Sequence, residues 1–305
     1  MMALQLFANA LALGAAYALV AFGFVLVLNA TTAVNFAQGD LVVAGGFAAV
    51  ALAASLKLPG IALLPLVMLL MAVLGLGLSL AAYFPLKSRS PVPVFLSTIA
   101  AGVMLQNAIN IGFGPEPRTG PPLIASGAFE LMGVVIGRQA LAVILVAVLL
   151  YAGLHLLLRH TRIGRRIRAT AEDREMAAAL GIRVDAMVAL AFALAAASAG
   201  AAGLLLANSF FVTPTDGGNY MIKAYIAAAI GGWGRIGGAA IGAVLIAMFE
   251  VLFPALPTLL PMGWLTGFGW LFSQTASAII LYAVLLGILA VKPRGLFGER
   301  AEQRA

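Results

Sequence analysis

The chain has little charge and no cysteine. Only 10% of its 305 residues are Asp, Glu, Lys or Arg, whereas a soluble globular protein carries about 25%. The absence of cysteine excludes disulfides, thiolate metal ligands and a cysteine nucleophile. Acidic residues are scarcer than basic ones, at 11 against 18, which gives a net charge of +7. Most of the chain therefore lacks the charge that a water-exposed surface needs.

Long apolar runs take the place of the missing charge. Hydrophobic residues make up 63% of the chain, and the mean hydropathy is +1.07. The few charged residues cluster between these runs, which is the distribution of a membrane protein. Because the basic residues lie beside the apolar runs, the orientation rule for membrane proteins accounts for them, and we expect no nucleic-acid partner.

The apolar runs predict an all-α polytopic transmembrane bundle with about nine spans. About 20 helical residues cross a hydrocarbon core of about 30 Å, and backbone polar groups in lipid must be satisfied within the helix. We expect spans at residues 4–28, 41–55, 61–84, 92–112, 138–158, 186–211, 219–231, 236–254 and 270–291. The second and seventh are short, so one or both are expected to be broken or re-entrant helices. The first lacks the basic start of a signal peptide and is expected to be retained.

Counting basic residues beside the nine predicted spans gives an orientation. One side receives 14: Lys87, Arg89, Arg159, Arg162, Arg165, Arg166, Arg168, Arg174, Arg183, Arg235, Lys292, Arg294, Arg300 and Arg304. The other side receives four: Lys57, Arg118, Arg138 and Lys223. The larger set is therefore expected in the cytoplasm, with the N-terminus outside. The Pro- and Gly-rich residues 113–137 then form an external loop, either a plain connector or a docking surface for an external partner.

The polar segment at residues 159–185 is the largest that we expect in the cytoplasm. Thr170 is placed as the N-cap of a compact helix over Ala171–Leu180, acidic residues follow in its first turn, and Gly181 is suited to end it. The helix presents a small apolar face. It either anchors to anionic membrane lipid or enters a groove on a protein, and its small residues and mixed charge favour the protein groove.

Three stretches resemble the permeases of branched-chain amino acid ABC transporters. They are residues 169–182 (ATAEDREMAAALGI), residues 14–23 with 34–40 (GAAYALVAFG and VNFAQGD), and residues 227–239 (AAAIGGWGRIGGA). The terminal sequence KPRGLFG at 292–298 is a further trait of that family. Gln38 and Asp40 stand where the family often has His and Glu.

The resemblance implies the permease subunit of an importer for branched-chain or related small amino acids in the bacterial inner membrane, with residues 1–305 as one permease domain. Its implied partners are two cytoplasmic ATPase subunits, a second and different permease subunit, a periplasmic or extracellular solute-binding protein, and membrane lipid. The sequence has no Gly-x-x-x-x-Gly-Lys-Ser/Thr phosphate loop, so we expect another chain to bind nucleotide, and this chain to be no enzyme and to need no cofactor.

The resemblance also implies that the cytoplasmic helix couples to the ATPase. The candidate coupling residues are Thr170, Ala171, Glu172, Asp173, Arg174, Glu175, Met176, Ala178, Ala179, Leu180 and Gly181.

Polar residues within the predicted spans are candidates for the translocation pathway, because a charge at a helix centre costs about 2.5 to 3.5 kcal/mol on insertion scales. They are Asn35, Gln38, Asp40, Gln106, Asn107, Asn110, Asn208, Lys223 and Glu250. Hydrogen bonding between helices is the alternative role for each. Lys223 and Glu250 lie on adjacent predicted spans and are expected to be able to pair.

Two other functions remain open at this point. A related permease could carry urea, amides or sugars, because the external binding protein largely selects the substrate in such systems. An ion-coupled secondary transporter would also have broken helices and polar groups at mid-membrane. The coupling segment at residues 159–185 gives that function no support.

Overall fold

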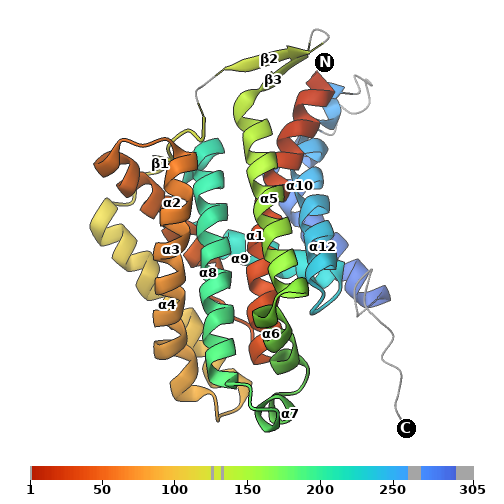
Figure 1. The fold of residues 1–305 in the computed structure, drawn as a ribbon. Coiled ribbons are helices and arrows are strands. Elements are labelled where there is room, and N and C mark those ends of the chain that lie inside the picture. The colour runs from red at the N-terminus through yellow and green to blue at the C-terminus, as the bar shows by residue number, and fades with distance from the viewer. Residues whose placement is uncertain (1, 125–126, 132–133, 260–268, 293–305) are drawn as a thin grey trace.

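Long apolar helices run between two ends of the molecule in the computed structural model, which describes residues 2–124, 127–131, 134–259 and 269–292 (Figure 1). The helices are α1 (Met2–Thr31), α2 (Gln38–Leu56), α3 (Gly60–Leu78), α4 (Pro91–Phe113), α5 (Arg138–His160), α6 (Arg162–Glu172), α7 (Arg174–Ala179), α8 (Val184–Ser209), α9 (Gly217–Gly231), α10 (Ile236–Leu259) and α12 (Gln274–Val291). The shorter elements are a π-helix η1 (Ser79–Tyr83), 3₁₀-helices η2 (Phe84–Leu86) and η3 (Gly269–Phe272), and strands β1 (Arg118–Thr119), β2 (Ala128–Leu131), β3 (Val134–Gly137) and β4 (Phe211–Val212).

Seven helical stretches within the described residues are long and apolar enough to cross a membrane. They are Ala3–Thr31, Gln38–Leu56, Gly60–Leu86, Val92–Phe113, Arg138–His160, Val184–Ser209 and Ile236–Leu259. Helix α9 has 15 residues, a rise of about 22 Å, which is shorter than a hydrocarbon core of about 30 Å. The all-α multi-pass architecture is confirmed, and nine crossings remain a prediction.

Contacts between loops and helix ends define two ends of the bundle. At the end that carries α6 and α7, which we call the basic end, Lys87 pairs with Asp185 at 2.5 Å and Asn29 donates to the Gly234 carbonyl at 2.8 Å. At the opposite end, the Gly60 amide donates to the Pro122 carbonyl at 2.8 Å. The N-terminus and the β2–β3 hairpin lie at this opposite end as well (Figure 1). The predicted sidedness of these loops is therefore consistent with the arrangement of the helices.

Helices α1 and α8 form the centre of the bundle. In the most apolar 18-residue stretch of each helix, 89% of the α1 residues and 83% of the α8 residues are buried, against 44% or less in the other five candidate spans. Helix α1 packs on α10 as α8 packs on α3, and α1 and α8 also pack on each other. Close approaches depend on glycine: a β-carbon on Gly45 would overlap the backbone of Gly200, and one on Gly231 the backbone of Gly238. Each central helix thus packs along one outer helix, α1 along α10 and α8 along α3.

Two helices begin inside the bundle. The Gln38 side chain at the start of α2 is fully buried and donates to the Ala195 carbonyl of α8 at 3.2 Å. The first residue of α9, Gly217, lies against Asp40 in the first turn of α2. The amino-terminal ends of α2 and α9 therefore meet in the interior, as expected for broken helices. Helix α2, predicted over 41–55, begins earlier and is long enough to cross.

The segment at residues 113–137 is mostly non-helical but contains strands that the sequence did not indicate. Strands β2 and β3 form an antiparallel hairpin in which Ala128 pairs with Gly137. Strand β1 pairs with β4, with Arg118 opposite Val212. The second pairing joins residues 113–137 to the strand that follows α8, so this segment is attached to the helices at the end of the bundle opposite the basic end.

Candidate functional site

The polar segment at the basic end contains two helices where one was predicted. The helix expected over Ala171–Leu180 is divided: α6 ends at Glu172, and α7 begins at Arg174. Asp173 separates them with an extended backbone, and its carboxylate accepts hydrogen bonds from the Glu175 and Met176 amides, both at 2.9 Å. A carboxylate that satisfies free amides in this way is the usual start of a new helix.

The prediction of Thr170 as the N-cap was therefore wrong. Thr170 is 1% exposed and lies inside α6. The N-cap of α6 is Thr161, whose hydroxyl accepts from the Gly164 amide at 3.0 Å, and the N-cap of α7 is Asp173. Residues 162–170, for which no helix was predicted, also belong to α6, because Thr161 is a capping residue that the sequence interpretation overlooked.

The predicted stop at Gly181 is confirmed. Gly181 has φ +78°, a left-handed conformation that glycine adopts without strain. Its amide donates to the Ala178 carbonyl at 2.9 Å, and the Ile182 amide donates to the Ala177 carbonyl at 3.0 Å. This pair of bonds is the Schellman motif that terminates helices.

Helix α7 presents an apolar face to solvent, and its first residue binds the bundle. Met176 is 59% exposed and Leu180 is 73% exposed, whereas Ala177 is 2% exposed and packs inward. On the inner side, the Arg174 guanidinium donates to the Tyr83 hydroxyl at 3.0 Å and to the Ala30 carbonyl at the end of α1. Arg174, included among the coupling residues, therefore points into the bundle and fixes α7 to it.

The polar motif after α1 is buried among helices. The Asn35 side-chain oxygen accepts from the Ala37 amide at 3.2 Å, and the Phe36 amide donates to the Thr98 hydroxyl of α4 at 3.1 Å. The side-chain amide nitrogen of Asn35 and the side-chain oxygen of Gln38 are buried without a hydrogen-bond partner. Unsatisfied buried amides of this kind are costly, and a bound water or polar ligand would satisfy them.

Asp40 lies where α2, α4 and α9 meet. A β-carbon added at Gly102 of α4 or at Gly217 of α9 would overlap its carboxylate. Asp40 is in the first turn of α2, and its carboxylate lies against the first residue of α9. Because helix amino-terminal ends carry partial positive charge, two of them stabilise this carboxylate in the interior.

Lys223 and Glu250 form a pair, as the sequence allowed, and Tyr17 completes a cluster of three. The Lys223 ammonium lies 2.7 Å from Oε1 of Glu250 and donates to the Tyr17 hydroxyl at 2.7 Å. The Tyr17 hydroxyl in turn donates to Oε2 of Glu250 at 3.2 Å. The Lys223 and Glu250 side chains are 19% and 23% exposed. Each charged group is therefore satisfied from two directions.

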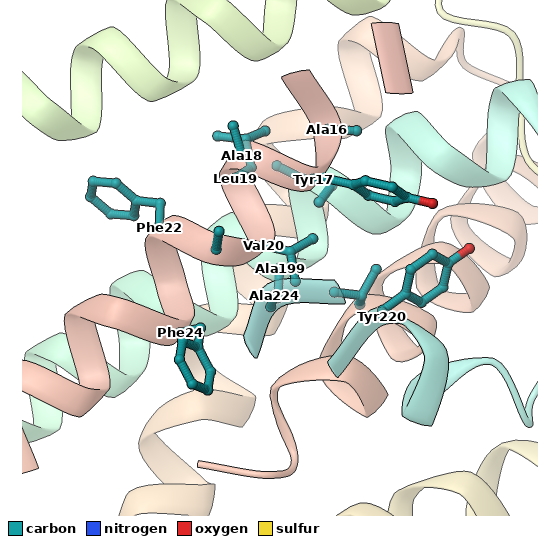
Figure 2. Close-up of a cluster of buried hydrophobic side chains, with 14 of the residues drawn as sticks. Ala16, Tyr17, Ala18, Leu19, Val20, Phe22, Phe24, Ala199, Tyr220 and Ala224 are labelled. Atoms are coloured by element: carbon teal, nitrogen blue, oxygen red, sulfur yellow. The ribbon is translucent and has the colours of Figure 1, made fainter. Parts of the chain in front are cut away.

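A cavity of about 380 Å³ adjoins this cluster. Its polar lining consists of Tyr17, Asp216, Asn219, Tyr220, Lys223, Glu250 and Gln274. Figure 2 shows that the Tyr17 and Tyr220 hydroxyls point to the same side, away from Phe22 and Phe24. The tyrosines thus divide a polar cavity from the apolar centre of the bundle. Sequence reasoning did not include Tyr17 or Asn219, although polar residues within apolar runs were the available signal.

The other pathway candidates do not join this cavity. The Asn208 amide group donates to the Pro121 carbonyl at 2.6 Å and so ties α8 to the 113–137 segment. On α4, Asn107 is exposed and donates to the Val103 carbonyl of its own helix at 2.7 Å, while the side-chain oxygen of Asn110 is buried without a partner. Gln106 is partly buried on the same helix. The nine candidates therefore fall into separate groups.

Comparisons with known proteins cover nearly the whole chain. A family model described as branched-chain amino acid transport system, permease component, matches residues 6–289. The chain is 29% identical over 310 residues to the high-affinity branched-chain amino acid transport system permease protein BraD of Pseudomonas aeruginosa, covering 97% of this chain and 96% of that protein. The terminal residues 293–298, which contributed to the resemblance, lie outside the described structure.

Two further relatives have the same printed role. Identity to the high-affinity branched-chain amino acid transport system permease protein LivH of Escherichia coli K12 is 29% over 309 residues, covering 97% of this chain and 96% of that protein. Identity to the probable branched-chain amino acid transport permease protein LivH of Methanocaldococcus jannaschii is 30% over 291 residues, covering 92% of this chain and 88% of that protein. No solved structure matches the chain.

Proposed function

Because the chain belongs to the family of branched-chain amino acid transport system permease components, we propose that it is the permease subunit of an ATP-binding-cassette importer for branched-chain or related small amino acids. The family match over residues 6–289 carries this proposal. The multi-pass helical architecture supports a role within the membrane, and the bacterial relatives support the inner membrane as its location.

The α7 face supports ATPase docking. Met176 and Leu180 place two large apolar side chains in solvent at the basic end, and the exposed Ala178 and Ala179 add no bulk beside them. Apolar surface that is exposed and held rigidly is characteristic of a protein-binding site. In the proposal, two ATPase subunits each receive such a helix, one from this chain and one from a second permease subunit.

Arg174 gives the docking helix a mechanical connection to the membrane helices. It joins α7 to the end of α1 and to Tyr83 of η1. The Tyr83 ring packs on Phe192 of α8 with 5.6 Å between centroids. A displacement of α7 on ATP binding is therefore passed to α1 and α8, the two central helices, which is the kind of rigid-body coupling that switches transport proteins.

The exposed face of α4 is our proposed contact for the second permease subunit. Met104 is 72% exposed and Ile111 88% exposed, and the Asn107 amide is exposed between them. The Asn107 side-chain nitrogen donates to the Val103 carbonyl, but lipid offers its side-chain oxygen no hydrogen-bond donor. A second permease chain would cover it. At the opposite end, the hairpin in residues 113–137 is the proposed contact for the external solute-binding protein.

The cavity beside Lys223 and Glu250 is our proposed part of the substrate pathway. An amino acid carries an ammonium and a carboxylate, and this cavity offers groups of both signs within 2.7 Å of each other. Tyr17 and Asn219 add hydrogen-bonding groups to its lining. We expect this pair to bind a passing amino acid weakly, because Lys223 and Glu250 already neutralise each other.

One other substrate class and one other mechanism compete with this proposal. A permease of the same architecture serves urea, amides or sugars equally well if the external binding protein selects the cargo. An ion-coupled secondary transporter is favoured by the half-buried carboxylate of Asp40 and by the short helix α9, which begins beside it.

Reconstitution separates these functions. Proteoliposomes that contain this chain, the second permease subunit and both ATPases, with binding protein outside, should accumulate labelled leucine only when ATP is supplied. The permease alone should show neither ATP hydrolysis nor uptake under an imposed H⁺ or Na⁺ gradient. Gradient-driven uptake by the single chain would identify a secondary transporter. ATP-dependent uptake of urea but not of leucine would retain the importer and reject the substrate class.

A further inference from the structure

A second cavity lies at the basic end, between the ends of α1 and α5, helix α6 and the start of α10. Its volume is about 690 Å³. The basic residues that line it are His155, Arg159, Arg168 and Arg235. In the described part of the chain, no acidic side chain is among its lining residues. Unlike the cavity beside Lys223, it therefore presents positive charge only.

An apolar groove of about 370 Å³ adjoins this cavity on the side of the membrane-spanning helices. Residues of α1, α5 and α10 line it, and both α5 and α10 pack on α1. Ile241 lines both the cavity and the groove. Where they adjoin, the Tyr151 hydroxyl donates to the Ile236 carbonyl at 3.1 Å. Tyr151 apart, the groove lining is aliphatic.

The combined space is at least as deep as one leaflet of a bilayer. Along α1 its lining runs from Asn29 to Leu11, 18 residues or about 27 Å. Ten residues separate Arg235, which lines the cavity, from Leu245, which lines the groove, a rise of about 15 Å along α10. Half of a hydrocarbon core is also about 15 Å. Arg159 lies in the last turn of α5 and Arg235 directly before α10, at the level where lipid headgroups are found, and Arg168 lies on α6 beside them. A basic cavity above an apolar groove of this depth is complementary in shape and chemistry to an anionic phospholipid, whose headgroup is charged and whose acyl chains are apolar.

We propose that the cavity and groove bind one anionic phospholipid, with its phosphate against Arg159 and Arg168 and an acyl chain along the groove. Guanidinium groups bind phosphate oxygens through paired hydrogen bonds, and basic pockets between membrane helices select anionic headgroups. Arg168 is already oriented, because it donates to the Leu158 carbonyl. The aliphatic groove is what selects a lipid over free phosphate, which has no apolar part to bury.

The bound lipid would contact two parts of the protein that lie far apart in the sequence. Arg168 belongs to α6, which adjoins the docking helix α7, whereas Ile241 belongs to α10. A phosphate at α6 and an acyl chain beside α10 connect these two elements. The assignment needs only that the chain spans a membrane, so it does not depend on the transported substrate.

A fluorescence measurement on the full chain tests the site. The native chain has no cysteine, so a Leu245→Cys variant carries one bimane probe at the edge of the groove, where Leu245 is 44% exposed. A Leu149→Cys variant is the control, because Leu149 is 62% exposed on α5 and does not line the groove. Each labelled permease is placed in phosphatidylcholine nanodiscs with increasing fractions of phosphatidylglycerol or phosphatidylcholine whose acyl chains carry bromine, which quenches the probe.

Brominated phosphatidylglycerol should quench the Leu245 probe at a lower mole fraction than brominated phosphatidylcholine does, whereas the Leu149 probe should respond alike to both. Replacing Arg159 and Arg168 by Gln should lower the preference roughly 30-fold, the effect of two basic residues at a membrane surface. Replacing Arg162 and Arg166 by Gln removes the same charge from the same segment and should preserve the preference, because neither residue lines the cavity.

Three results would overturn the proposal. Equal quenching of the Leu245 probe by both lipids would show an unselective groove. Relief of quenching by millimolar inorganic phosphate would show that free phosphate competes for the basic cavity. Loss of quenching by either lipid once the second permease subunit is assembled would show that protein fills the groove.

Discussion

The cluster of Lys223, Glu250 and Tyr17 supports a quantitative prediction. Replacing Lys223 by Met leaves the Glu250 carboxylate beside an apolar side chain, and among the described residues the Tyr17 hydroxyl then remains as its donor. Removing one partner of a buried pair costs about 3 to 5 kcal/mol. Because both side chains are about one fifth exposed, we expect the lower value, a loss of about 3 kcal/mol in the free energy of unfolding.

The assay is unfolding in mixed detergent micelles with increasing SDS, followed by circular dichroism. Lys87→Met is the matched control: its ion pair with Asp185 has a comparable distance, 2.5 Å, but the side chains are 42% and 62% exposed, so the loss should be about 0 to 1 kcal/mol. The double variant Lys223→Met, Glu250→Gln removes both charges and should recover most of the stability. Equal losses for Lys223→Met and Lys87→Met would refute the reasoning.

Uptake by the same double variant separates a structural role from a role in the pathway. If the pair only joins α9 to α10, restoring stability restores ATP-dependent uptake. If the charges contact the passing amino acid, as proposed, uptake stays low although the folded protein is recovered. Restored uptake in a stable, uncharged variant would remove Lys223 and Glu250 from the pathway.

Other predictions concern the docking helix and the sidedness of the chain. Ala178→Trp should leave the permease folded but prevent co-purification with its ATPases, whereas Ala178→Ser should not; unchanged assembly in the Trp variant would exclude α7 as the docking element. Gly181→Val should cost about 1 to 2 kcal/mol at the left-handed turn and weaken ATPase association more than Gly181→Asn does, since asparagine tolerates that conformation; equal association of the two variants would argue against a rigid stop. Arg174→Gln should keep the ATPases bound and hydrolysing ATP while uptake falls, and Arg174→Lys should retain part of it; full uptake with Gln would show that motion travels by another route. Single cysteines at Lys87 and Arg118 should react with an impermeant maleimide from opposite sides of the membrane, and labelling from one side would overturn the predicted topology.

The docking segment shows how far local sequence reasoning extends. The stop at Gly181 was predictable because glycine is suited to a left-handed residue, a property of the local backbone. The start was predicted wrongly because Thr170 and Asp173 are both good capping residues, and the choice between them depends on burial. Thr170 is buried in α6 against the bundle, while Asp173 stays in solvent with its carboxylate free to cap α7. Only the packed structure supplies that difference.

The sequence by itself determined the membrane architecture and the family. Apolar runs of about 20 residues have one favourable environment, and segments such as 169–182 and 227–239 carry enough specific residues for the resemblance that the family match confirmed. The tertiary structure alone decided which polar residues come together. Lys223 meets Tyr17, 206 positions away, while Asn208 turns to the Pro121 carbonyl. Such contacts depend on how α1, α8, α9 and α10 pack around their glycines, and spacing along a single helix carries no information about its neighbours.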